Sequence, residues 1–373
     1  MSWFRPRSAL WWVYCLVCLI GAIALVLQML PAAVLTWSGI LVGVPFIVVT
    51  LLVIAALLMW LDLYRDHVRI RRVLAMGFVW GLAAGPGIAI FGNDNMIHAI
   101  QNLTGDAFAV NWQAPISAAL IEEGIKGTGV LAVTWLFRPL LTRPMHGLLL
   151  GACTGLGFQL TEDITYEANA GLLSAQGDIG SALVVGVLRL LTGLTSHWML
   201  TGIAGIGIVT AAGASRWSRG RRAATLLVFY LLAAAMHFGW DAPISGASGF
   251  GTVVRRTILY VVVFAVVYLW VVRIERRWYR SIVDWTVAQH MAPPDELNTL
   301  ITRRSRRRAR RAPPRRPHRI AVLRRRELLD WVQAVDARLT VTGGAILGES
   351  SGPGLDDGAG RTFRPTRQPT REE

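Results

Sequence analysis

Ionisable side chains inside stretches of sequence that are otherwise apolar are the candidates for chemistry: Glu122, Glu123, Lys126, Glu162, His197, His237 and Asp241, with Asp163 and Arg189 in the same stretches. An ionisable group at the centre of a bilayer costs ~2.5–3.5 kcal/mol on insertion scales, so it needs a reason to be there. Carboxylates and imidazoles are the side chains that activate water, transfer protons and bind transition metals. These residue types in these places indicate a functional site.

Lys126 is the only lysine in the chain, and it lies four residues after Glu122. That spacing puts both side chains on one helix face, while Glu123 points about 100° away. We therefore predict that Lys126 neutralises one carboxylate and that the other faces a site; a buried structural ion pair is the alternative. His237 and Asp241 have the same one-turn spacing, in which the Asp orients the imidazole or shares a metal with it.

Two arrangements of these groups would hydrolyse a bond. In the first, Glu162, His197 and His237 bind Zn²⁺ and Glu122 or Glu123 is the general base, since three protein ligands plus water is the usual catalytic zinc site. In the second there is no metal: a buried glutamate activates water directly, and the histidines orient it and stabilise the oxyanion. The sequence leaves both arrangements open.

Apolar runs of about 20 residues, long enough to cross a hydrocarbon core of ~30 Å, must position these side chains. They predict an all-α fold, a polytopic membrane bundle of about eight helices near residues 10–30, 38–61, 73–91, 114–136, 146–166, 181–213, 223–243 and 253–272. The composition, 53% hydrophobic and only 16% charged, agrees with a membrane protein, since a soluble domain carries roughly 25% charged residues. The run at 181–213 is too long for one straight span, so we expect a break near Gly193 and Thr195.

Arginine is confined to every second loop between these runs. Residues 31–37, 92–113, 167–180 and 244–252 contain no Lys or Arg, with Arg255 and Arg256 as the exception on that side. By the positive-inside rule, the chain is a multi-pass cell-membrane protein with both termini in the cytoplasm. Glu122, Glu162 and His237 then lie toward the outer ends of their spans, and so does His197 if its span is broken. A shared polar cavity near the outer face is the economical explanation.

The last hundred residues are rich in arginine, and residues 303–326 alone contain 13. We divide the chain into an N-terminal transmembrane hairpin (1–72), a candidate enzyme domain (73–272) and an Arg-rich cytoplasmic tail (273–373). The tail should be mostly disordered apart from a short amphipathic helix at 327–339. Its arginines suit anionic lipids; nucleic acid is not expected, because no interleaved aromatics or folded recognition element accompanies them.

Four motifs, in order, resemble those of the PrsW-type intramembrane proteases, which belong to the wider clan of CAAX prenyl proteases and bacteriocin-immunity proteases. Glu122-Glu123-Gly-Ile-Lys126 resembles their EExxK motif and Phe158-Gln-Leu-Thr-Glu162 their FxxxE motif. His197, and His237-Phe-Gly-Trp-Asp241, resemble the third and fourth motifs. The resemblance covers roughly residues 70 to 272.

The resemblance implies an intramembrane protease, a peptide hydrolase of a metalloprotease family, with Glu122 and Glu123 as activating acids. CAAX-type relatives have His at the position of Glu162 and Arg at the position of Lys126. Because these two site residues differ, the metal use of those relatives does not predict a metal in this chain. The expected substrate is a membrane-anchored protein cut near the exoplasmic side, for which an anti-sigma factor is a candidate. The alternative is an ion- or proton-coupled transporter; it would favour paired repeats, and none is visible in the sequence.

Overall fold

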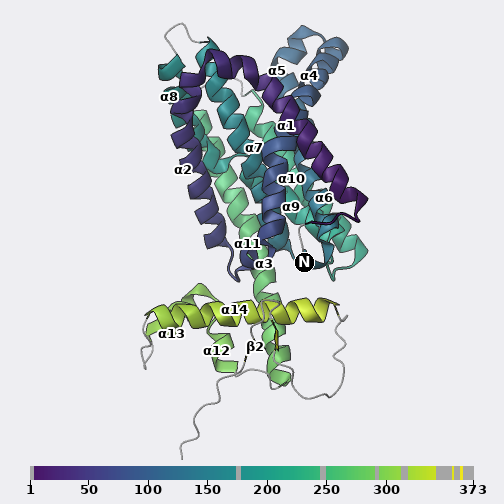
Figure 1. Ribbon diagram of the computed structural model, residues 1–373, viewed down its shortest axis with the longest axis vertical. Helices are drawn as coiled ribbons and strands as arrows, with labels where there is room; N and C mark the ends of the chain where they lie inside the picture. The colour runs from purple at the N-terminus through teal and green to yellow at the C-terminus, as the bar shows by residue number, and fades with distance from the viewer. Residues whose placement is uncertain are drawn as a thin grey trace, which may run out of the picture. The chain divides into compact units, whose positions relative to one another are not determined.

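The structure is a computed structural model that describes residues 4–173, 178–243, 249–289, 294–311, 318–341, 355–356 and 362–363. The helices that precede the tail are α1 (Ala9–Leu35), α2 (Trp37–Leu61), α3 (Asp66–Val79), α4 (Gly85–Thr104), α5 (Asp106–Ser117), α6 (Glu123–Leu136), α7 (Pro144–Leu173), α8 (Asp178–Thr192), α9 (His197–Ala212), α10 (Arg219–Asp241) and α11 (Phe250–Ala288). The predicted all-α class is confirmed (Figure 1).

Shorter elements complete the chain. Two π-helical segments, η1 (Trp80–Ala84) and η2 (Ala118–Glu122), and two 3₁₀ turns, η3 (Arg138–Leu140) and η4 (Gly193–Thr195), lie between the long helices. The tail contains α12 (Pro294–Asn298), α13 (Arg303–Arg311), α14 (His318–Val341) and a two-stranded antiparallel pair, β1 (Leu355–Asp356) and β2 (Thr362–Phe363).

The chain forms two compact units. The first comprises Met1–Asp62 and Ile70–Val271, and the second comprises Leu63–Arg69 and Val272–Glu373. All seven candidate residues lie in the first unit, which also contains α1 and α2.

The second unit contains more regular structure than the composition of the tail predicts. α14 buries a stripe of side chains at helical spacing: Leu328, Trp331, Val332, Val335 and Leu339. The predicted amphipathic helix at 327–339 is therefore confirmed, and it is longer than expected. Residues 294–311 and 318–341 are largely helical where disorder was expected, because the average composition of the tail hides this local apolar stripe.

Among the residues that the structure describes, six helices are long and apolar enough to cross a membrane: Ala9–Leu35, Trp37–Leu61, Asp66–Thr104, Ile179–Ala212, Arg219–Asp241 and Phe250–Ala288. The two other predicted spans, near 114–136 and 146–166, are also helical, and they contain Glu122, Glu123, Lys126 and Glu162. A multi-pass membrane bundle is confirmed, while the count of eight and the orientation stay predictions.

The break predicted in the run 181–213 is confirmed. α8 ends at Thr192, η4 forms a single 3₁₀ turn, and α9 begins at His197 after Ser196, whose φ of −99° and ψ of −149° are not helical. Gln159 on α7 donates its Nε2 to the carbonyl oxygen of Gly193 at 3.1 Å. A neighbouring helix thus satisfies a backbone group near the break, and His197 stands in the first turn of a helix.

α9 is the central helix of the first unit, packed against α6, α7 and α10 (Figure 1). Its contact with α7 is backbone to backbone. A Cβ atom at Gly155 would lie 2.2 Å from the carbonyl oxygen of His197, and one at Gly151 would lie 2.1 Å from that of Thr201. Only glycine fits at these positions. Because Glu162 lies two turns beyond Gly155 on α7, this close approach brings Glu162 beside His197.

Candidate active site

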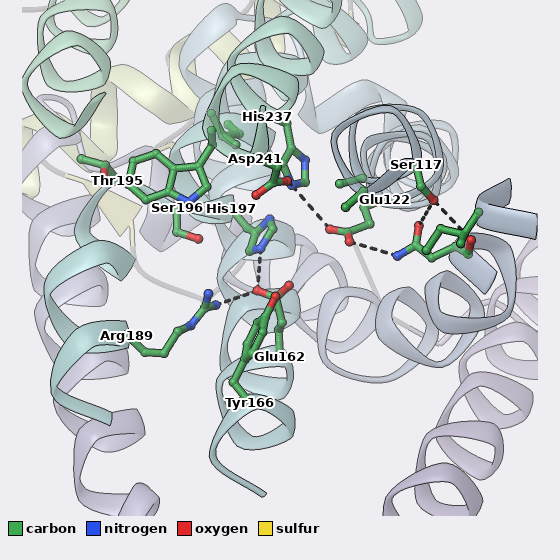
Figure 2. A pocket seen from close by; sticks show the side chains of 16 residues that line it. Ser117, Glu122, Glu162, Tyr166, Arg189, Thr195, Ser196, His197, His237 and Asp241 are labelled. Carbon is green, nitrogen blue, oxygen red and sulfur yellow. Dashed lines mark hydrogen bonds and ion pairs between the residues drawn. The ribbon is translucent and has the colours of Figure 1, made fainter. Parts of the chain in front are cut away.

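Four parts of the helical bundle carry the seven predicted residues, and Figure 2 shows five of them: Glu122, Glu162, His197, His237 and Asp241. Glu122 is the last residue of η2, and Glu123 and Lys126 lie in the first turn of α6. π-helical turns shift side chains around a helix axis and are frequent at functional sites. Trp80, at the start of η1, donates its Nε1 to the carbonyl oxygen of Ile125 at 3.0 Å and so holds this turn in place.

A pocket with a volume of about 410 Å³ lies where these elements meet. Five of the seven predicted residues line it: Glu122, Glu162, His197, His237 and Asp241. Glu123 and Lys126 do not line the pocket and are both 0% exposed. Glu122 is therefore the carboxylate of the pair that reaches the pocket.

Lys126 holds three groups behind the pocket. Its Nζ lies 2.7 Å from Glu123 Oε1, 2.8 Å from His197 Nδ1 and 3.6 Å from Glu122 Oε2. The nearer carboxylate is that of Glu123, three residues before, and not that of Glu122, four residues before. Both spacings share one helix face, so spacing alone could not choose; His237, which also contacts Glu123, holds that carboxylate near Lys126.

His237 presents one ring nitrogen to the pocket. Its Nδ1 lies 2.9 Å from Glu123 Oε1, and a carboxylate there accepts the Nδ1 proton and leaves a lone pair on Nε2. Nε2 lies 3.7 Å from Glu122 Oε2 and 3.8 Å from Asp241 Oδ2. Proteins commonly present an imidazole to a metal in this way, with a carboxylate fixing the tautomer.

His197 has both ring nitrogens engaged. Lys126 can only donate, so Nδ1 accepts from its ammonium, and Nε2 donates to Glu162 Oε2 at 2.7 Å. Arg189 continues the chain of contacts, with its terminal nitrogen 2.6 Å from Glu162 Oε2 and its Nε paired with Asp163. Figure 2 shows the Arg189 side chain directed at Glu162, which in turn orients His197.

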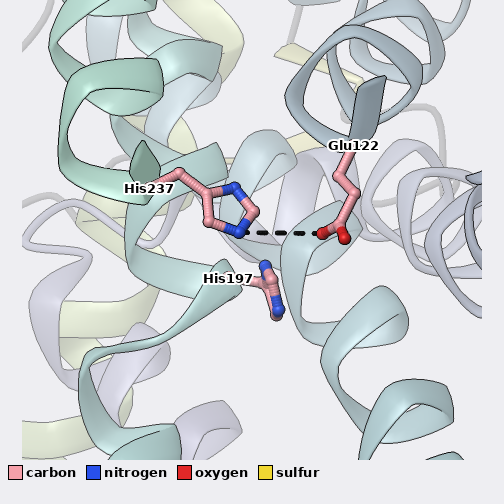
Figure 3. Close-up of side chains that lie close together, drawn as sticks. All are labelled: Glu122, His197 and His237. Atoms are coloured by element: carbon pink, nitrogen blue, oxygen red, sulfur yellow. Dashed lines mark ion pairs between the residues drawn. The ribbon is translucent and has the colours of Figure 1, made fainter. Parts of the chain in front are cut away.

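The residues present fit a metal ion. Glu122, His197 and His237 offer ligand atoms that all lie within 4.8 Å of one another (Figure 3). To bind a metal, His197 would give up one of its two hydrogen bonds, to Lys126 or to Glu162, because both of its ring nitrogens are engaged. Glu122 Oε2 is buried and accepts no hydrogen bond among the described residues. Two ligand atoms on a tetrahedral zinc with bonds of ~2.0–2.2 Å are roughly 3.4 Å apart. The 3.7 Å between Glu122 Oε2 and His237 Nε2 is close to that value.

The predicted ligand Glu162 has a different geometry. Its Oε2 lies 2.7 Å from His197 Nε2, which is a hydrogen-bond distance and is shorter than the separation of two ligands on one zinc. In this arrangement Glu162 is a hydrogen-bond partner of His197, while its assignment as a metal ligand stays a prediction.

Some contributing residues were outside the predicted set. Arg189 is conspicuous in the sequence as the only residue of the four types Asp, Glu, Lys and Arg in the run 181–213, but the sequence alone assigned it no role at the site. Asn93 donates to Glu122 Oε1 at 3.1 Å, and Ser117 donates to Asn93 Oδ1 at 2.8 Å. Neutral polar residues such as these two carry no comparable signal in a sequence.

Arg256, one of the two arginines that depart from the topology pattern, has a structural role. The guanidinium of Arg256 donates to the carbonyl oxygens of Trp240 and Ala242 at the end of α10. These carbonyls have no partner within the helix, so the arginine caps the turn that carries Asp241.

Buried glutamates and histidines around a pocket in a helical membrane bundle are the features of an intramembrane hydrolase. The family model described as PrsW family intramembrane metalloprotease matches residues 69–271, which is more than half of the chain. The chain belongs to this family, and the resemblance inferred from the four motifs is confirmed. No match is found among curated proteins or among solved structures. All seven predicted site residues lie within the matched segment.

Proposed function

We propose that the chain is an intramembrane peptidase that hydrolyses a peptide bond of a membrane-anchored protein in the 410 Å³ pocket. One observation carries this proposal: Glu122 Oε2, without a hydrogen bond, meets His237 Nε2 and His197 at a pocket in a chain of a metalloprotease family.

Glu122, His197 and His237 would hold a Zn²⁺, which as a Lewis acid polarises the scissile carbonyl when bound. Glu123 accepts the Nδ1 proton of His237 and keeps Nε2 directed at the pocket. Lys126 compensates the charge of the two adjacent glutamates. Lys126 and Glu123 lie fully buried behind the pocket, whereas Glu122 reaches it. Arg189 fixes Glu162, and Glu162 fixes the ring of His197.

Asp241 is the proposed proton carrier. Its side chain is 33% exposed, lines the pocket and approaches His237 Nε2 to 3.8 Å. Its carboxylate would accept a proton from the attacking water and return it to the amine of the departing peptide. Positioned acid–base catalysis of this kind contributes ~10²–10⁴-fold to a rate.

We further propose that the pocket opens toward the exoplasmic side. Asp241 is the last residue of α10, and the sequence that follows it, residues 244–252, contains no Lys or Arg. Substrates would be cut near their outer juxtamembrane end, and a membrane-anchored regulator such as an anti-sigma factor suits that geometry. The Arg-rich tail would contact anionic lipids on the cytoplasmic side.

The test is cleavage of a single-pass substrate by the purified protein in liposomes, with the product termini read by mass spectrometry. We expect cuts in the outer third of the substrate span, none with Glu122→Gln, and loss of cleavage with a zinc chelator. Cuts at the cytoplasmic end would overturn the proposed side. Cleavage that survives chelation would favour the metal-free arrangement, in which Glu122 Oε2 takes the proton of water. Proton flux without any cleavage would favour a transporter.

A further inference from the structure

A second and larger cavity, of about 760 Å³, lies in the first unit and shares no lining residue with the candidate active site. It is a groove with α6 and α10 as walls and the last turns of α9 as its floor. Gly124 and Gly127 leave the wall on α6 bare, and Tyr230 on α10 is the nearest side chain to both. Ile208 and Ala211 form the floor.

The groove faces hydrocarbon. Trp135, Leu227 and Leu231 line it and are 55%, 60% and 60% exposed. α10 is long and apolar enough to cross a membrane, and large apolar side chains exposed on such a helix lie against lipid. Whatever occupies the groove is therefore apolar along most of its length.

The groove is long enough for a large part of an acyl chain. Gly124 to Trp135 on its α6 wall span ~16 Å at ~1.5 Å per residue. An extended acyl chain can therefore lie along α6 between the bare glycines and the side chains of α10.

One end of the groove is strongly basic. Arg138 and Arg222 line that end, and Arg219 and Arg221 lie in the same first turn of α10. None of the four forms an ion pair with an acidic group among the described residues, and residues 137–161 and 211–240 contain no Asp or Glu. Arg138 and Arg222 donate to the backbone carbonyls of Ala211 and Gly213, which leaves their positive charge without a counter-charge. Such arginines at the end of an apolar groove complement a negatively charged headgroup.

We propose that this groove binds an anionic phospholipid, with an acyl chain between α6 and α10 and the phosphate at Arg138 and Arg222. A transmembrane helix of a substrate is the competing occupant; the arginines at one end of the groove favour a negatively charged headgroup over an apolar helix.

The test is lipid binding to the detergent-purified full chain, measured by native mass spectrometry with phosphatidylglycerol and phosphatidylcholine of identical acyl chains. The wild type should prefer phosphatidylglycerol. Arg138→Gln and Arg222→Gln should each weaken that preference by roughly 5-fold, at the contribution expected for one arginine near a lipid surface. Gly124→Leu should weaken binding of both lipids, because the added side chain fills the groove.

Two further variants show whether a weaker preference for phosphatidylglycerol comes from the groove, from a general loss of positive charge or from misfolding. Arg71→Gln removes an exposed arginine that does not line the groove, and it should leave the preference unchanged. Arg222 also donates to the carbonyl oxygen of Ala211, so Arg222→Lys keeps the charge and should retain most of the preference.

Three results would overturn the proposal. Equal losses in Arg71→Gln and Arg222→Gln would show a nonspecific charge effect. Unchanged binding in Gly124→Leu would show that no acyl chain lies in the groove. Displacement of phosphatidylglycerol by millimolar inorganic phosphate would indicate a site for a soluble anion and not for a lipid.

Discussion

Replacing Lys126 with Met tests how the buried charges are held together. The substitution keeps an unbranched side chain of similar length but removes the ammonium, which lies 2.7 Å from Glu123 Oε1 and 2.8 Å from His197 Nδ1. Both Lys126 and Glu123 are 0% exposed, so water cannot replace the lost partner. Removing one member of a buried ion pair costs about 3–5 kcal/mol. That is a large fraction of the ~5–15 kcal/mol that stabilises a typical folded protein.

A double-mutant cycle isolates this interaction. We expect Lys126→Met to lower the free energy of unfolding in detergent by about 3–5 kcal/mol. Adding Glu123→Gln should restore much of the loss, because the orphaned charge is then gone; the coupling between contacting residues is typically ~0.5–3 kcal/mol. Purely additive effects, or a Lys126→Met protein as stable as wild type, would refute the assignment of a buried pair.

The same position separates charge from shape. Lys126→Arg retains a positive charge but replaces a compact ammonium with a planar guanidinium. The Nζ atom of Lys126 alone lies between Glu123 and His197, and a guanidinium is larger than this ammonium. We therefore expect the Arg variant to fold but to lose peptidase activity, because the larger group displaces these two side chains. Full activity of Lys126→Arg would show that charge alone is required.

The remaining predictions concern the wider site, the topology and the tail. Arg189→Gln should lower peptidase activity about 10–100-fold, the usual effect of removing a residue that orients a ligand, and Arg189→Lys should recover part of it in the same assay. Asp241→Asn should lower turnover by at least ~10²-fold while bound zinc, measured by elemental analysis, is retained. Reporter fusions should locate Gly105 outside and Ser218 inside the cell. Deletion of residues 303–373 should leave activity in detergent intact but weaken sedimentation with anionic vesicles, most clearly at low salt.

The helical bundle was largely predictable because it depends on properties that a sequence displays. The run at 181–213 exceeds the ~20 residues of one span, so its length alone indicated the break at Gly193–Thr195. The π-helical turn Ala118–Glu122 could not be predicted, since it depends on how α6 packs against Trp80 and not on local residue preferences. The helix α14 was only partly predicted, because arginine-rich flanks obscure its apolar stripe.

The types of residue at the site were predictable, and their pairings were not. An acid or a histidine in an apolar run is conspicuous, which is why Glu122, Glu162 and His237 were found. Which carboxylate contacts Lys126, however, depends on where α10 places His237 relative to Glu123. The role of Arg189 likewise depends on the position of α8 beside α7, which no spacing along the chain encodes.

The account depends most directly on Glu122 as the metal-binding carboxylate of a peptidase. The decisive measurement is zinc content together with substrate cleavage, for protein stripped with a chelator and then reloaded with Zn²⁺. We predict that wild type binds zinc and regains cleavage, that Glu122→Gln does neither, and that Glu162→Gln still binds zinc. A Glu122→Gln protein that binds zinc and cleaves substrate like wild type would contradict the account.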